Sequence, residues 1–166
     1  GKLYFPWTVN ALIPDMVRGR LAGPLARLNE SDGTLDTGFR VDPAIAAVRH
    51  LARQTDGRIV AGVSIGDVHR VVRLNANGST DTSFTSPAFA RGVRFVTLQP
   101  DGKVLVAATD NLQLNPPANA LALAAPTIYR LLNDGSLDAS FTPVALNAPF
   151  GNVFGPPVVD LQGRIY

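Results

Sequence analysis

The chain has 166 residues, of which 46% are hydrophobic and 17% are charged, a composition that excludes a disordered chain and favours one buried core. The net charge of +2 comes from basic residues spread along the chain without dense Lys/Arg blocks, which argues against nucleic-acid binding. There is no cysteine and no apolar run of about eighteen residues, so neither a disulfide framework nor a membrane span is expected.

The N-terminal segment begins with GKLYF at 1–5 and continues into an insertion at 5–24 that is rich in Pro, Ala and Leu. Tyr4, Phe5 and Trp7 form an aromatic cluster beside this insertion, and sugar rings stack on such side chains. A place in the core or in an interface is the alternative for the same cluster. These three residues are the candidates for a ligand-binding or interface loop.

Two motifs alternate along the rest of the chain, and each recurs. The first reads RLNESDGTLDTGF at 27–39, RLNANGSTDTSF at 73–84 and RLLNDGSLDASF at 130–141. The second reads QTDGRIVAG at 54–62 and QPDGKVLVAA at 99–108, with shortened copies at 1–5 and 161–166. Asp-Gly and Asn-Gly pairs predict tight turns, because glycine supplies the positive φ that these turns need.

The flanks of these turns are rich in β-branched residues and predict strands. The expected strands are 48–54, 58–64 and 69–75, then 93–99, 103–109 and 127–133, with a short fourth strand in TDTSF (80–84) and LDASF (137–141). A second insertion, 109–126, falls in the same hairpin as the first one. In a repeat array such insertions form loops on one face, which is often the binding face.

Four short strands in each period predict an all-β, β-propeller-type array of three antiparallel blades, with an incomplete ring in one chain. The periods are 1–56, 57–101 and 102–162 within a single repeat domain, 1–166, which is either a segment of a larger protein or one protomer of an assembly. The recurring Phe39, Phe84 and Phe141 are expected to fill the same niche between neighbouring sheets. The recurring Asp36, Asp81 and Asp138 are expected to accept backbone N–H bonds in the turn.

The alternation of QPDGK with the RLN-DGSLD-SF pattern resembles the delta-60 repeat, a bacterial β-propeller repeat, over essentially the whole chain. The resemblance implies a propeller-type array, usually within a large exported or surface-associated bacterial protein. It supplies no established catalytic residues. The pattern is degenerate at Leu132 and Gln162.

Sites for chemistry are few in this sequence. His50 and His69 are the only histidines, with Asp67 near the latter, and no nucleophile elbow, phosphate-binding loop or HExxH motif occurs. The oxygen-bearing side chains at alternate positions from Asn75 to Asp81 resemble the start of a calcium loop, but an Asx-type turn explains the same spacing. We therefore expect no catalytic residues, no metal and no cofactor.

Three blades cannot close a ring, because propellers have about four to eight. The leading function is therefore a non-enzymatic structural and interaction module of an exported bacterial protein, which assembles with its own kind or presents loops. Its expected partners are further copies of the chain, as a homo-oligomer or filament, or further repeats of a longer chain. A carbohydrate-binding or adhesin propeller with a polysaccharide ligand is the alternative, and an enzyme fragment comes last. The expected location is extracellular or at the cell surface.

Overall fold

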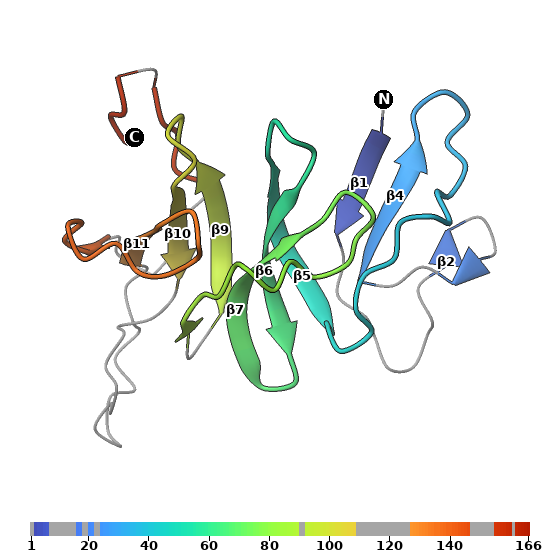
Figure 1. Ribbon diagram of the computed structural model, residues 1–166, viewed down its shortest axis with the longest axis horizontal. Coiled ribbons are helices and arrows are strands. Elements are labelled where there is room, and N and C mark those ends of the chain that lie inside the picture. The colour runs from blue at the N-terminus through green and yellow to red at the C-terminus, as the bar shows by residue number, and fades with distance from the viewer. Residues whose placement is uncertain are drawn as a thin grey trace.

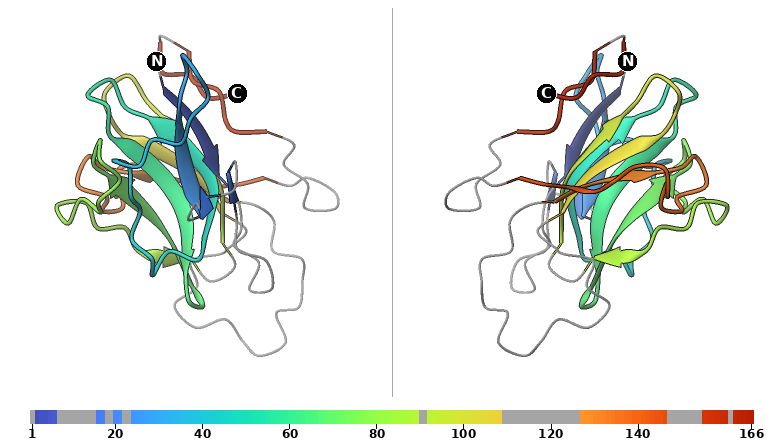
Figure 2. Two further views of the ribbon diagram at one scale, coloured as in Figure 1. Left: turned by 90° about the vertical axis from the view of Figure 1, so that its right-hand side faces the viewer. Right: turned by 90° about the vertical axis from the view of Figure 1, so that its left-hand side faces the viewer.

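The computed structural model describes residues 2–6, 16–17, 20–21, 24–89, 92–108, 127–146, 155–160 and 162–166, all of them in strands, turns or loops. Three antiparallel sheets stand in a row, and we call them blades 1, 2 and 3 in chain order (Figure 1). In the side views the sheets lie one behind another (Figure 2). Blade 2 therefore lies between the other two.

Blade 2 consists of β5 (Ala47–Arg53), β6 (Ile59–Ile65), β7 (Val68–Leu74) and β8 (Ala88–Phe89), with each strand paired to the next. The sequence of β6, IVAGVSI, is buried over its first six residues, as expected for a strand covered on both faces. Gly57, with φ +89°, makes the turn between β5 and β6, where Gln54 N–H donates to Arg58 O at 2.8 Å. The predicted hairpin at this position is confirmed.

Blade 3 repeats this order with β9 (Val93–Leu98), β10 (Val104–Ala108), β11 (Thr127–Leu131) and β12 (Val144–Ala145). In blade 1 the described sheet holds two strands, β1 (Lys2–Pro6) and β4 (Leu25–Asn29). β2 (Met16–Val17) and β3 (Arg20–Leu21) form a separate two-stranded ribbon within the first insertion. Three blades of antiparallel strands are thus present, and the ring is not closed.

A period of the sequence and a blade of the structure are out of phase by one strand. β5 precedes Gly57 in the chain, yet it pairs with β6, which follows Gly57. The same holds for β9 and β10 on either side of Gly102. At the C-terminal end, a hairpin with Gly163 at φ +79° repeats the turn of the second motif, and Pro157 O beside it accepts the Thr97 hydroxyl at 2.8 Å.

The fourth strand expected within TDTSF (80–84) and LDASF (137–141) is wrong. Those segments make one isolated bridge each, Leu74 with Thr80 and Leu131 with Leu137, and then turn around an aspartate. The fourth strand comes later, as the two-residue strands β8 and β12. The aspartate side chain bonds the backbone locally, and this local bonding competes with strand pairing.

The core consists of two clusters, one in each contact between consecutive blades, which we call seam 1–2 and seam 2–3. Phe39 packs in seam 1–2 with residues of β5, β6 and β7, and Phe84 packs in seam 2–3 with residues of β9, β10 and β11. Only 7% of Phe39 and 6% of Phe84 is exposed. The predicted role of these two rings between neighbouring sheets is confirmed.

Most of each insertion, 7–15, 18–19 and 22–23 in the first and 109–126 in the second, lies outside the described residues. The first insertion joins β1 to β4, and the second joins β10 to β11. The strand ends that they join lie on the side of the array opposite to the Gly57 turn, between β5 and β6, and the Gly102 turn, between β9 and β10 (Figure 1). Among the described residues, no helix is long and apolar enough to cross a membrane.

Candidate functional site

Each copy of the first motif ends in a tight turn closed by its aspartate. One carboxylate oxygen, Oδ1, accepts the backbone N–H of the residue two positions later, and the phenylalanine N–H then donates to the aspartate carbonyl. The aspartate and N–H donor pairs are Asp36 with Gly38, Asp81 with Ser83 and Asp138 with Ser140, each at 3.0 Å. The predicted backbone bonds of the three aspartates are confirmed.

The other oxygen of each aspartate, Oδ2, binds the arginine that begins the motif. The Nε–Oδ2 distances are 3.0 Å for Arg27–Asp36, 2.7 Å for Arg73–Asp81 and 2.8 Å for Arg130–Asp138. A second cation, supplied by the second motif, approaches the same oxygen at 2.8 Å from Lys2, 3.1 Å from Arg58 and 3.9 Å from Lys103. Each aspartate therefore lies between two cations that come from neighbouring strands of its blade.

These contacts favour the ionised form of each carboxyl group. The bond from Lys2 is the largest cause that holds the pKa of Asp36 below 3.8. For Asp81 and Asp138 the largest cause is the hydroxyl of Ser83 or Ser140, with Arg73 or Arg130 adding to it, and the pKa of each lies below 3.8. All three aspartates are therefore anions at neutral pH.

The same arginines lie over the phenylalanine rings of their own motifs. The guanidinium carbon is 4.6 Å from the ring centroid for Arg27 and Phe39, 5.0 Å for Arg73 and Phe84, and 4.7 Å for Arg130 and Phe141. A guanidinium at this distance is attracted by the negative face of the ring. The arginine thereby helps to hold the ring in place.

The arginine then reaches across the seam to the next blade. Arg27 Nη1 donates to the main-chain carbonyl of Ala76, and Arg73 Nη1 donates to that of Asn133 at 2.7 Å. These acceptors are equivalent residues of the first-motif turns in repeats 2 and 3. Charge-assisted bonds of this kind are stronger than neutral ones.

A backbone bond accompanies each arginine bond. The residue after the phenylalanine donates its N–H to the residue before the turn glycine, as Arg40 N to Asn77 O at 2.9 Å and Thr85 N to Asp134 O at 2.8 Å. Two main-chain carbonyls of each turn therefore hold the previous blade. The seams have the same hydrogen-bonding plan.

The turn glycines make this close approach possible. A Cβ atom on Gly78 would lie 2.6 Å from Arg40 O, and one on Gly135 would lie 2.8 Å from Thr85 N. Both residues also have positive φ, +92° and +88°, which side chains rarely adopt. No other residue fits at these two positions without moving the backbone of the neighbouring blade.

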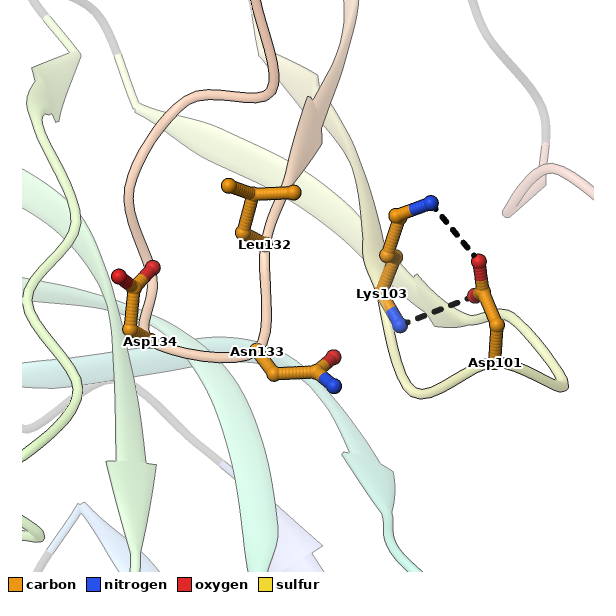
Figure 3. Close-up of a pocket in the computed structure, with 5 residues that line it drawn as sticks. All are labelled: Asp101, Lys103, Leu132, Asn133 and Asp134. Carbon is orange, nitrogen blue, oxygen red and sulfur yellow. Dashed lines mark hydrogen bonds and ion pairs between the residues drawn. The ribbon is translucent and has the colours of Figure 1, made fainter.

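An open recess of about 470 Å³ lies beside seam 2–3, between the two turns of repeat 3. Figure 3 shows Asp101 and Lys103 on one side of it and Leu132, Asn133 and Asp134 on the other. Lys103 Nζ is 3.0 Å from the Asp101 carboxylate, which holds the pKa of Asp101 below 3.8. The main-chain carbonyls of Asn133 and Asp134 accept the bonds from Arg73 and Thr85 across seam 2–3, so the recess borders the residues of that seam.

Of the predicted aromatic cluster, the structure describes the side chain of Tyr4. The Tyr4 ring packs edge-on against Phe39, with centroids 5.8 Å apart and planes at 77°, and belongs to the core of seam 1–2. Phe5 lies within β1, and Trp7 lies outside the described residues. Tyr4 is thus partly buried against the core of seam 1–2, and a ligand or interface loop at these three residues stays a prediction.

The histidines serve local contacts. His50 Nδ1 accepts the Val96 N–H across seam 2–3 at 3.3 Å, and burial lowers the pKa of His50 below 6.5. His69 Nδ1 lies 2.8 Å from the Ser64 hydroxyl on the paired strand. These contacts place both rings within the packing of blades 2 and 3.

The alternate oxygens of the calcium-like segment are used in the turn. Asn77 Oδ1 accepts both the N–H and the hydroxyl of Ser79, at 3.0 and 2.8 Å. The Asp81 carboxylate is bound by Arg58 and Arg73. No group of three or more metal-binding side chains occurs in the part of the chain that the structure describes.

The arginine bonds across the seams were not predicted from the sequence. Arg73 and Asn133 are 60 residues apart in the chain, and no local pattern connects them. The available signal was the recurrence of arginine eight or nine residues before aspartate, together with the fixed Gly–Phe spacing. Those side chains recur because each repeat makes the same contact with the next one.

A family model described as a β-propeller domain of unknown function, DUF5122, matches residues 54–84 and 124–141. A search of the curated proteins finds no match. The matched stretches contain the arginine, aspartate and phenylalanine of repeats 2 and 3 and both turns that accept the seam bonds. The repeats of this chain are therefore β-propeller repeats, set in an all-β array whose ring is not closed.

Proposed function

We propose that this chain is a non-enzymatic structural module that works by associating with further copies of its own repeat. The observation that carries the proposal is the use of the recurring side chains. Arg73 binds Asp81, lies over Phe84 and bonds to the next blade, and Phe84 packs there too. Arg27, Asp36 and Phe39 repeat this arrangement. What recurs in the sequence is thus a device for joining repeats.

The mass of the native particle tests this function. Light scattering over a range of concentrations should give masses above the 17.6 kDa of the chain, rising with concentration. Mass photometry on the native source material should agree. A mass of one chain at every concentration, in a folded sample, would contradict self-association.

The absence of enzymatic activity is part of the proposal. It is supported by the place of His50, whose Nδ1 accepts a backbone N–H, a contact that requires this nitrogen to be unprotonated and occupies it. Ser64 is 8% exposed, so the Ser64–His69 pair offers little surface to a substrate. Screening the purified chain against hydrolase substrates should give no turnover above that of a His69→Gln variant.

Carbohydrate binding stays a prediction of the sequence, resting on Tyr4, Phe5 and Trp7. The Tyr4 ring packs edge-on against Phe39 and is partly buried. A glycan array probed with the chain and with a Trp7→Ala variant measures it directly. Loss of a specific glycan signal in the variant would support an adhesin role over a purely structural one.

We also propose that the chain belongs to an exported or cell-surface bacterial protein. The support is the resemblance of its motifs to the delta-60 repeat, whose arrays occur in such proteins. Antibody labelling of intact source cells, compared with lysed cells, tests the location. Signal only after lysis would contradict it.

A further inference from the structure

The two seams share one template with two complementary halves. One half, which we call the socket, is the arginine, the phenylalanine and the following residue of a blade. The other half, the plug, is the first-motif turn of the next blade. In seam 2–3 the socket is Arg73, Phe84 and Thr85, and the plug is the turn Asn133–Gly135.

Blade 3 carries a third socket in Arg130, Phe141 and Thr142. Its contacts within the repeat are complete, with Arg130 bound to Asp138 at 2.8 Å and to Ser140 at 3.2 Å, and stacked over Phe141. Within the described ranges, no carbonyl accepts from Arg130 Nη1 or from Thr142 N. Phe141 is partly exposed and Thr142 exposed, whereas Phe39 and Phe84 are buried. This socket is formed, and no turn of the described ranges fills it.

Blade 1 carries a third plug in the turn 30–33. Asp32 Oδ1 accepts the N–H and the hydroxyl of Thr34 at 2.9 and 2.8 Å, as Asn77 does for Ser79 in the plug of seam 1–2. Gly33 has φ +63°. It is partly exposed, whereas the corresponding glycines of the other two turns, Gly78 and Gly135, are buried in their seams.

We propose that the socket of blade 3 binds the turn 30–33 of a second copy of this chain, forming a third seam between molecules. This inference rests on the proposed self-association and names the surface that carries it. Arg130 Nη1 and Thr142 N donate to carbonyls of the partner's turn, and Phe141 becomes buried as Phe39 and Phe84 are.

The place of the two halves determines the kind of assembly. Socket and plug lie in blades 3 and 1, at opposite ends of the row of blades (Figure 1). Association is therefore head to tail, and one molecule uses its two halves on two neighbours or, in a ring of two copies, on the same neighbour. Such contacts close into a ring or continue as a fibre, depending on the rotation between copies.

The first turn differs from the other two in one respect. It is one residue longer, so Gly33 N–H donates to Asn29 O at 2.8 Å across four positions, where Gly78 N–H donates to Asn75 O at 2.9 Å across three. The socket must therefore accept a wider turn than the internal sockets do. Deleting Ser31 gives the plug the internal length and should strengthen association about tenfold, because the turn then fits the socket as the internal turns do.

Paired cysteines test the contact, because the chain has no cysteine of its own. Asp32→Cys and Thr142→Cys are placed in separate chains, mixed and oxidised. The control is Thr85→Cys with Asp134→Cys in one chain, whose backbones are joined by the 2.8 Å bond of seam 2–3. We expect the mixture to give a covalent heterodimer in excess of what either variant gives alone, and the control to close within the chain.

An arginine variant gives a second, independent measurement. Arg130→Lys keeps the charge but loses the planar fork that binds aspartate and carbonyl together, and should weaken association about tenfold or more. Arg73→Lys makes the same change in seam 2–3, inside one molecule, and should leave association unchanged. Equal effects of the two substitutions would contradict the proposal.

The outcomes separate this inference from the function on which it rests. Association by light scattering without the Asp32–Thr142 cross-link, while the control closes, would overturn the contact and leave self-association standing. A chain that remains a monomer would overturn both. A cross-link lost on removing Ser31 would place the plug elsewhere and also count against the contact.

Discussion

In seam 2–3, Asp81 is bound by two arginines, Arg58 and Arg73, and by the Ser83 hydroxyl at 2.7 Å. In seam 1–2, the equivalent Asp36 is bound by Lys2 and Arg27, and Gly38 stands where the serine would be. Both seams nevertheless have the same arginine–carbonyl bond, backbone bond and buried ring. The shared part is what builds the array, and the additional hydroxyl only adjusts its strength.

The largest expected effect comes from breaking the shared part. Gly78→Ala puts a Cβ atom 2.6 Å from the Arg40 carbonyl at a φ of +92°, so the backbone of seam 1–2 must move. We expect a loss of about 3 kcal/mol or more in the free energy of unfolding, measured by urea denaturation.

Gly66→Ala is the matched control for this substitution. Gly66 also has positive φ, +55°, but nothing lies within 4 Å of an added Cβ. Only the conformational cost, about 1–2 kcal/mol, should appear. Equal losses in the two variants would mean that the close contact between blades adds nothing.

The next effect sharpens the difference between the two aspartates. Asp81→Asn leaves Arg73, whose side chain is 9% exposed, without its anion and should cost about 2 kcal/mol. Asp36→Asn should cost less, about 1 kcal/mol, because the Lys2 side chain is 42% exposed and Asp36 accepts no hydrogen bond from a serine hydroxyl at position 38. Thermal or urea unfolding of both variants at neutral pH checks this order.

A pH titration separates the seams further. Among the described contacts, a histidine bridges seam 2–3, where His50 accepts the Val96 N–H, but not seam 1–2. Burial lowers the pKa of His50 below 6.5, so the unfolded chain binds more protons than the folded one in the interval between the two values. Stability should therefore fall as the pH drops below about 6.5. His50→Gln, whose amide oxygen can still accept the Val96 N–H, should make the urea midpoint less dependent on pH in that interval.

The lowered aspartates contribute at a lower pH. The pKa values of Asp36 and Asp81 lie below 3.8, so their stabilisation is present above about pH 4 and is lost as the pH falls further. The His50→Gln variant should keep this second loss. Absence of this second loss in the variant would contradict its assignment to the aspartates.

The smallest expected effect is a gain in stability. Gly38→Ser supplies the hydroxyl that Ser83 and Ser140 give to their aspartates at 2.7 and 2.6 Å. An added Cβ would lie 3.3 Å from Asp36 Oδ1, a neighbour that a serine meets in the other repeats as well. We expect about 0.5–1 kcal/mol of added stability in urea unfolding. A loss would show that the turn of repeat 1 differs from the others in more than this hydroxyl.

The strands from 47 to 74 were predictable because β-branched runs lie there on both sides of an Asp-Gly turn and end before an Asn-Gly turn, both of which are local signals. β8 and β12 were missed because two residues carry too little pattern, and the segment before each is a turn made by aspartate. The role of Phe84 followed from its recurrence. The partner of Arg73 could not follow, because its acceptor is a carbonyl, a group that every residue has.

That last property has a consequence for how such chains grow. The acceptors in the two seams belong to Ala76 and Asn133, residues with unlike side chains. The arginine bonds to the main-chain carbonyl in both cases, so the side chain of the acceptor residue is not used. A repeat with this turn can therefore follow any repeat that has the arginine and the phenylalanine, without matched changes in either. Duplication or loss of one whole period in the gene leaves the new neighbours compatible at once, so arrays of different lengths can arise from one founding unit.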